Sequence, residues 1–223
     1  MNDVAASSEI YQFRIVLRDA SPHVLRRIRV CRSISLGEFH HTLQVAFGWS
    51  GSRPSRFLIR GKAYGINSPS GRDDVDPLRL ADFHFLPKER FLYEYEVDSH
   101  GRPRWRHQVR FERALPVEPR RLYPICMGGM GAEPPEKCGG QKGLAEFRTL
   151  FTPSYILNRL AAVLDAGRTE KGIEELQHLR PWITLNECDR RVINHKLNLE
   201  LASLDPGKGE TDENRDSHYH QIR

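Results

Sequence analysis

The stretches FLYEYEV, residues 91–97, and RWRHQVRFE, residues 104–112, decide the fold of this chain. In both stretches, aromatic or aliphatic side chains alternate with charged or polar ones, which is the two-residue period of a strand with one buried face. The two stretches therefore predict a β-hairpin. The side chains predicted to face inward are Phe91, Tyr93, Tyr95, Val97, Trp105, His107, Val109 and Phe111.

The opposite side of this hairpin carries charge. Glu94 and Glu96 alternate with the aromatic residues of the first stretch, and arginines alternate with those of the second. Pairing the two strands predicts cross-strand ion pairs, each of which stabilises a sheet by roughly 0.2–1 kcal/mol. The basic segment is also a candidate for binding a polyanion such as nucleic acid, with a solvated or ion-paired face as the alternative. The candidate nucleic-acid-binding residues are Arg102, Arg104, Arg106 and Arg110.

Toward the N-terminus, a second hairpin and a helix are predicted. Residues 11–17 and 24–31 read as strands joined by a turn. Ser35 and Glu38 fit a capping box, in which each side chain bonds the other residue's backbone N–H. An apolar stripe with helical spacing follows, and Gly48 fits the left-handed position that ends a helix.

Toward the C-terminus, the pattern becomes helical. Residues 122–143 are rich in Gly, Pro and Cys and show no period, so they predict an ordered loop. Thr152 and Pro153 fit the N-cap and the first position of a helix. Two more helical patterns cover residues 169–179 and 187–201, and Pro181 is predicted to separate them.

Together these elements predict an α+β fold. We expect a mixed, mainly antiparallel sheet with a helix across one face, for which a β-grasp-like topology is one option, and a helical appendage at the C-terminus. The expected domains are residues 1–150 for the main α+β unit, 151–204 for a helical extension and 205–223 for a disordered tail.

Composition indicates a folded cytoplasmic protein. Apolar residues make up 39% of the chain and charged residues 28%, which suffices for a buried core. We find neither a signal-peptide pattern nor an apolar run of about 18 residues, so no membrane association is expected. The four cysteines show no C-x-x-C spacing, which favours a reducing compartment. The oligomeric state stays open.

Several short motifs follow one another in a fixed order between residues 9 and 150. They are Val24–Ile28 (VLRRI), Ala46–Trp49 (AFGW), Phe91–Tyr95 (FLYEY), Trp105–His107 (WRH) and Pro134–Gly140 (PPEKCGG). In this order the chain resembles the plasmid pRiA open-reading-frame-three-like family, also described as transposon passenger proteins of TnpR type. The resemblance implies an α+β fold and a neighbourhood of mobile DNA, and it implies no particular activity.

His107, Cys126 and Cys138 are the candidate metal ligands, because imidazole and thiolate suit Zn²⁺. The spacing of the two cysteines is not diagnostic, and the fourth ligand stays open among His40, His100 and Glu133. A hydrogen-bonded core histidine and two buried thiols are the alternative. Zinc is therefore the one cofactor that the sequence suggests.

A ligand pocket is a separate hypothesis. Its candidate residues are His40 on the first helix, Trp49 just beyond that helix, and the pair Glu133 and Glu136, which flank a double proline. The two carboxylates could act as an acid–base pair. Packing of His40 and Trp49 in the core is the alternative.

Two function classes follow from these residues. We expect a non-catalytic binding module associated with mobile DNA, which contacts nucleic acid or a protein partner through the basic face of the sheet. The alternative is a zinc-dependent enzyme, such as a hydrolase, centred on residues 123–140. We find no catalytic signature in the sequence, so whether the protein is an enzyme stays open.

Overall fold

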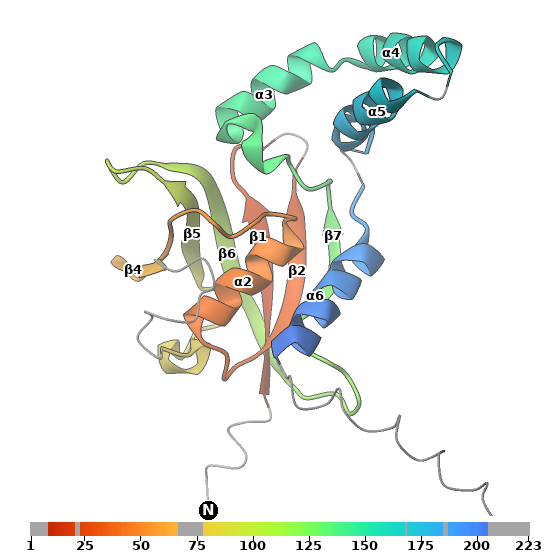
Figure 1. Ribbon diagram of the computed structural model, residues 1–223. Coiled ribbons are helices and arrows are strands. Elements are labelled where there is room, and N and C mark those ends of the chain that lie inside the picture. Colours follow the sequence, from red (N-terminus) through yellow and green to blue (C-terminus); the bar gives the residue numbers. More distant parts are fainter. Residues whose placement is uncertain (1–8, 21–22, 67–77, 168, 185–186, 205–223) are drawn as a thin grey trace, which may run out of the picture.

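The computed structural model describes residues 9–20, 23–66, 78–167, 169–184 and 187–204, and it confirms the α+β class. Seven strands form one sheet in the order β4-β3-β5-β6-β1-β2-β7 (Figure 1). Every pair among these strands is antiparallel, so the described sheet is antiparallel rather than mixed and lacks the parallel pair of a β-grasp sheet. The strands are β1 (Glu9–Leu17), β2 (Leu25–Cys31), β3 (Ser55–Ile59), β4 (Lys62–Ile66), β5 (Arg90–Val97), β6 (Pro103–Pro116) and β7 (Ile125–Met130).

Helices cover one face of this sheet and extend from one end of it. In Figure 1, α2 crosses the face, α6 lies beside it near β7, and α4 and α5 project away from the sheet. None of the helices in the described part of the chain is long and apolar enough to cross a membrane. The helical elements are α2 (Leu36–Ala46), α3 (Gly140–Leu150), α4 (Pro153–Asp165), α5 (Glu170–Ile183), α6 (Arg190–Leu204) and the short 3-10 turns η1 (Leu80–Phe83) and η2 (Glu136–Cys138).

The predicted central hairpin is confirmed as β5 and β6. Tyr93 pairs with His107, and Tyr95 pairs with Trp105. All four side chains are fully buried beneath α2 and the chain that follows it. The alternation of residues 91–97 and 104–112 therefore sets which side of the sheet becomes the core.

The capping box of α2 is also confirmed. The Ser35 hydroxyl accepts a hydrogen bond from the Glu38 backbone N–H at 3.1 Å, and a Glu38 carboxylate oxygen accepts one from the Ser35 N–H at 2.7 Å. Gly48 follows the helix with φ +66°. A side chain at Gly48 would collide with Glu133, whose carboxylate oxygen would lie 2.6 Å from the added Cβ.

We expect replacement of Ser35 by alanine to lower the free energy of unfolding by about 1 kcal/mol, because the Glu38 backbone N–H at the start of α2 loses the hydroxyl that accepts its hydrogen bond. Urea denaturation followed by circular dichroism measures the change. Ser154→Ala, at an exposed position in the first turn of α4, is the matched control. An equal loss in both variants would contradict the role of the cap.

Two predictions about the C-terminal half were wrong. Residues 122–143 contain β7 and the start of α3, because Ile125 to Met130 pair with β2 although the segment is rich in glycine. The α5 helix also continues past Pro181 to Ile183. The N-caps at Thr152 and Thr169 are present, while the predicted tail 205–223 lies outside the described residues.

Candidate nucleic-acid interface

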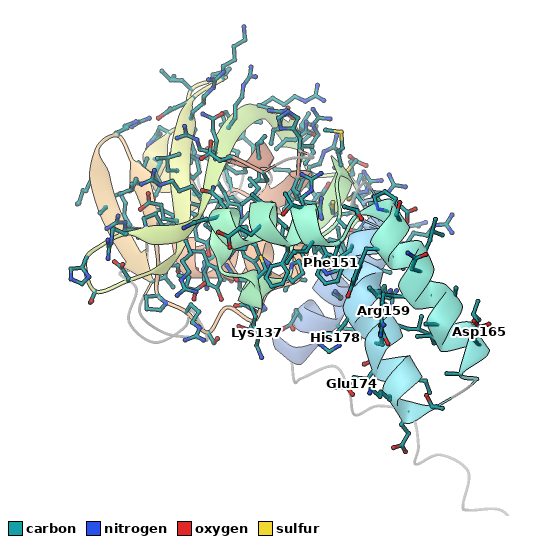
Figure 2. All side chains as sticks on the ribbon, turned by 90° about the horizontal axis from the view of Figure 1, so that it is seen from above. Lys137, Phe151, Arg159, Asp165, Glu174 and His178 are labelled. Carbon is teal, nitrogen blue, oxygen red and sulfur yellow. The ribbon has the colours of Figure 1, made fainter. Side chains whose placement is uncertain are left out.

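The two faces of the sheet differ in what covers them. One face packs against α2 and α6, whereas no helix of the described chain lies on the other, which we call the open face. Figure 2 shows many long side chains ending in nitrogen that project on the side away from α6. The basic side chains of the strands are therefore exposed to solvent on the open face.

Four arginines lie side by side across the open face. Arg90 of β5 pairs with Arg110 of β6. Arg110 also pairs with Arg14 of β1, which in turn pairs with Arg27 of β2. We call these four residues the arginine row. Because neighbouring strands are about 4.8 Å apart, the row spans roughly 14 Å.

Most of this positive charge is not neutralised. Arg27 donates to both carboxylate oxygens of Glu112, at 2.8 and 3.0 Å. By contrast, the described residues provide no hydrogen bond or ion pair to the side chains of Arg14, Arg90 and Arg110, and the buried Nε of Arg110 has no acceptor. Like charges directly opposite each other destabilise a sheet. Arg110 lies near enough to Glu112 for its charge to help lower the pKa of that carboxyl, but it forms no ion pair with it. Among the described residues, Arg14 and Arg90 have no carboxylate partner.

The next row of the open face is uncharged. It runs from Leu92 through Gln108 and Val16 to Leu25. These side chains are aliphatic or carry an amide, so they offer no aromatic ring on which a base could stack. The arginine row can therefore contact phosphates, whereas the uncharged row beside it provides no stacking surface for bases.

Three of the four arginines predicted from the sequence lie elsewhere and are ion-paired. Arg102 contacts Asp98 at 3.0 Å, and Arg104 contacts Glu96 at 3.4 Å. Arg106 contacts Glu94 at 3.2 Å, and Glu94 also binds Arg56 at 2.7 Å. The predicted cross-strand ion pairs are therefore confirmed, and only Arg110 of the predicted set belongs to the arginine row.

The three candidate metal ligands do not form a cluster. His107 is fully buried among aromatic rings of the core. Cys126 binds Asn194 of α6 through its backbone, and the Cys138 thiol donates to the Gly140 carbonyl at 3.7 Å. Within the part of the chain that the structure describes, no three His, Cys, Asp or Glu side chains are placed to hold a metal ion.

The candidate pocket residue His40 belongs to a buried hydrogen-bond network. Its Nδ1 lies 2.7 Å from the Tyr93 hydroxyl and 3.2 Å from the Ser55 hydroxyl. Gln44 donates to the same Tyr93 oxygen. Burial lowers the pKa of His40 to about 4, with a smaller contribution from His41. The His40 ring is therefore neutral near pH 7 and ties α2 to the sheet.

The other candidate pocket residues make packed contacts beside this network. Trp49 stacks on Tyr95 with ring centroids 5.3 Å apart, and its Nε1 donates to the Pro134 carbonyl at 2.9 Å. Burial alone would raise the pKa of Glu136, but hydrogen bonds from Tyr95 and Ser50 outweigh burial and lower that pKa.

These contacts bring Glu136 against the hydroxyl of Tyr95 and leave Glu133 separate, 3.9 Å from Lys196 of α6. Glu133 and Glu136 thus have different neighbours. The structure therefore brings Trp49 and Glu136 together in one packed cluster, without joining Glu133 to it as an acid–base partner.

The fold and the open face define an α+β protein with a broad antiparallel sheet and a basic surface. The chain matches the family described as Plasmid pRiA4b ORF-3-like protein over residues 9–154. The chain belongs to this family.

Two relatives extend the comparison. The chain is 28% identical over 153 residues to the "Uncharacterized protein y4hQ" of Sinorhizobium fredii, which covers 66% of this chain and 76% of that protein. The crystal structure titled "Protein of Unknown Function MM3350", from Methanosarcina mazei Go1, superposes with a TM-score of 0.58 at 22% identity, covering 82% of this chain and 97% of the other. At that identity, the likeness concerns the fold alone.

Proposed function

We propose that this protein is a non-catalytic binding module that holds the phosphate backbone of nucleic acid along the arginine row. The observation that carries the proposal is the register of Arg14, Arg90 and Arg110, three guanidinium groups on adjacent strands that form no hydrogen bond or ion pair with the residues that the structure describes. A guanidinium donates two parallel hydrogen bonds to phosphate, and it keeps its charge at any physiological pH. Contacts of this kind position a protein on nucleic acid without selecting a base sequence.

The electrostatic repulsion within the arginine row supports a binding role. Arginines placed opposite one another repel, and a surface of ordinary solubility needs no such arrangement. A bound phosphate chain would remove the repulsion by placing negative charge between the guanidinium groups. We therefore infer that the row serves to bind a ligand.

A cytoplasmic location and an association with mobile DNA belong to the same proposal. All four cysteines are free thiols, as expected in a reducing compartment. Membership of a plasmid-encoded family supports a nucleic acid as the partner in preference to a small substrate.

The salt dependence of binding tests this proposal. We expect the unmodified protein to bind labelled duplex DNA of unrelated sequences with similar affinity, and the logarithm of the binding constant to fall with the logarithm of salt concentration with a slope of about −3. This slope corresponds to about 0.9 per phosphate for three to four contacts. Fluorescence anisotropy between low and high salt measures it.

Two outcomes of this titration would contradict the proposal. Binding that does not change with salt would exclude phosphate contacts as the source of affinity. Competition by polyglutamate as effective as competition by unlabelled DNA would point instead to an acidic protein partner.

A further inference from the structure

A second arginine, on the other side of the same strand, has an unusual environment. Arg26 precedes Arg27 in β2, so its side chain points to the opposite face of the sheet, beneath the helices. Its exposed fraction is 0%. The guanidinium lies over the Phe47 ring, with its central carbon 5.4 Å from the ring centroid.

Backbone carbonyls hold this guanidinium in place. Nε donates to Ala46 at 3.0 Å, and Nη1 donates to Leu25, Met130 and Gly131 at 2.9, 3.2 and 2.9 Å. A guanidinium has five N–H donors, so the two on Nη2 remain. No acceptor among the described residues takes a hydrogen bond from Nη2, and no described carboxylate pairs with Arg26.

A buried charge without a counterion is costly, which makes the surroundings of Nη2 informative. Arg26 lines a cavity of about 460 Å³ between the sheet and the α5–α6 region. This volume is within the range of small-molecule sites. The unneutralised guanidinium at the wall of the cavity thus provides a fixed position for an anionic group.

The remaining charges of the cavity limit the kind of anion. Basic Arg180 and Lys196 line it, and so do three acidic residues, Glu133, Glu187 and Asp189. Lys196 and Glu133 lie 3.9 Å apart and largely neutralise each other. A dianion such as phosphate would be repelled by the carboxylates, whereas a ligand with one carboxylate and one ammonium group would match both signs.

We propose that this cavity binds a small zwitterion of the amino-acid class, with its carboxylate on Nη2 of Arg26 and its ammonium group toward the acidic residues. The site is on the helix-covered side of the sheet and is independent of the arginine row. A positive or negative result here therefore leaves the nucleic-acid proposal untouched.

Thermal unfolding of the full chain in the presence of single amino acids tests the proposal. We expect at least one of the twenty common amino acids at millimolar concentration to raise the unfolding temperature, and its amide, which lacks the carboxylate, to have no effect. Isothermal titration of that amino acid then gives its affinity. Inorganic phosphate serves as the comparison anion.

Two variants locate the binding. Val192→Trp places a large ring in the cavity from an exposed position on α6, and we expect it to weaken binding on the order of tenfold or more by filling the space. Leu199→Trp, also exposed on α6 but outside the cavity lining, is the matched control and should leave binding unchanged. Arg26→Lys, checked for folding, should weaken binding on the order of a hundredfold.

Each alternative result overturns the proposal. No response to any amino acid excludes the ligand class, and an equal response to the amide excludes the carboxylate contact with Arg26. Tighter binding of phosphate excludes a zwitterion. Equal losses in Val192→Trp and Leu199→Trp would place the ligand elsewhere.

Discussion

Replacing Arg14, Arg90 and Arg110 together by glutamine is expected to weaken binding to nucleic acid on the order of a thousandfold at low salt, because three phosphate contacts and their released counterions are lost. The slope of the salt dependence should become shallower by about 0.9 for each arginine removed. Fluorescence anisotropy with labelled duplex DNA at several salt concentrations measures both quantities.

The same variant should unfold less readily than the parent chain. Removing the Arg90–Arg110 and Arg110–Arg14 oppositions relieves repulsion worth roughly 0.2–1 kcal/mol for each pair. The buried Nε of Arg110, which has no acceptor among the described residues, also disappears. A surface that gains stability when its function is removed is typical of a binding site.

The matched control replaces Arg102, Arg104 and Arg106 by glutamine, which removes the same number of charges from β6 and the turn that precedes it. These arginines are ion-paired, and Glu94 keeps Arg56 as a partner after the change. We expect this variant to retain most of its affinity. A loss as large as that of the first variant would show that net charge, rather than the arginine row, determines binding.

The sequence predicts the central hairpin because the information is local. Each of the stretches 91–97 and 104–112 alternates within itself, and the two are joined by a short connection, so both the buried face and the pairing follow without knowledge of the rest of the chain. The capping box at Ser35 and Glu38 is local in the same way, since it involves one helical turn.

The arginine row could not be predicted in the same way. The sequence shows that Arg14 and Arg110 each point outward from a strand, but their opposition depends on the register between β1 and β6, strands that are far apart in sequence. A bulge near Gln12 also shifts that register. An uninterrupted strand count would therefore place different residues opposite each other.

The strand β7 was not predicted, because its glycines lack the pattern of a strand. Gly128 and Gly129 lack the side chains whose alternation identifies a strand, and glycine weakens strand propensity. The structure explains Gly129, because a Cβ there would lie 2.6 Å from the Leu25 carbonyl of β2. The close approach of β7 to β2 thus requires glycine, and glycine does not show the alternating pattern from which a strand is predicted.

Acid is expected to destabilise the protein well before its carboxylates titrate, because two histidines are buried in the neutral form. Burial lowers the pKa of His107 to about 3, although the backbone of Tyr93 acts in the opposite direction, and burial lowers that of His40 to about 4. In the unfolded chain both titrate near 6.5. Below pH 6.5 the unfolded state therefore binds more protons than the folded state, so stability is complete above this pH and falls as the pH decreases.

The size of this effect follows from the same linkage. Each histidine contributes a slope that approaches about 1.4 kcal/mol per pH unit below 6.5, so the two together lower the free energy of unfolding by about 3 kcal/mol between pH 6.5 and pH 5. That is a large share of the stability of an ordinary domain, about 5–15 kcal/mol. Urea denaturation at a series of pH values measures it.

Replacing His107 by phenylalanine should remove about half of this pH dependence. The imidazole lies among Phe47, Trp49 and Tyr93, with ring centroids 4.6, 5.2 and 5.3 Å away. The Tyr93 backbone is near enough to favour the protonated ring, but neither ring nitrogen makes a hydrogen bond of good geometry with the described residues. A phenyl ring can therefore fill the same space without leaving a partner unsatisfied. His178→Gln, at an exposed position on α5 (Figure 2), should leave the profile unchanged. A His107→Phe profile as steep as that of the parent chain would mean that the imidazole is not held neutral by burial.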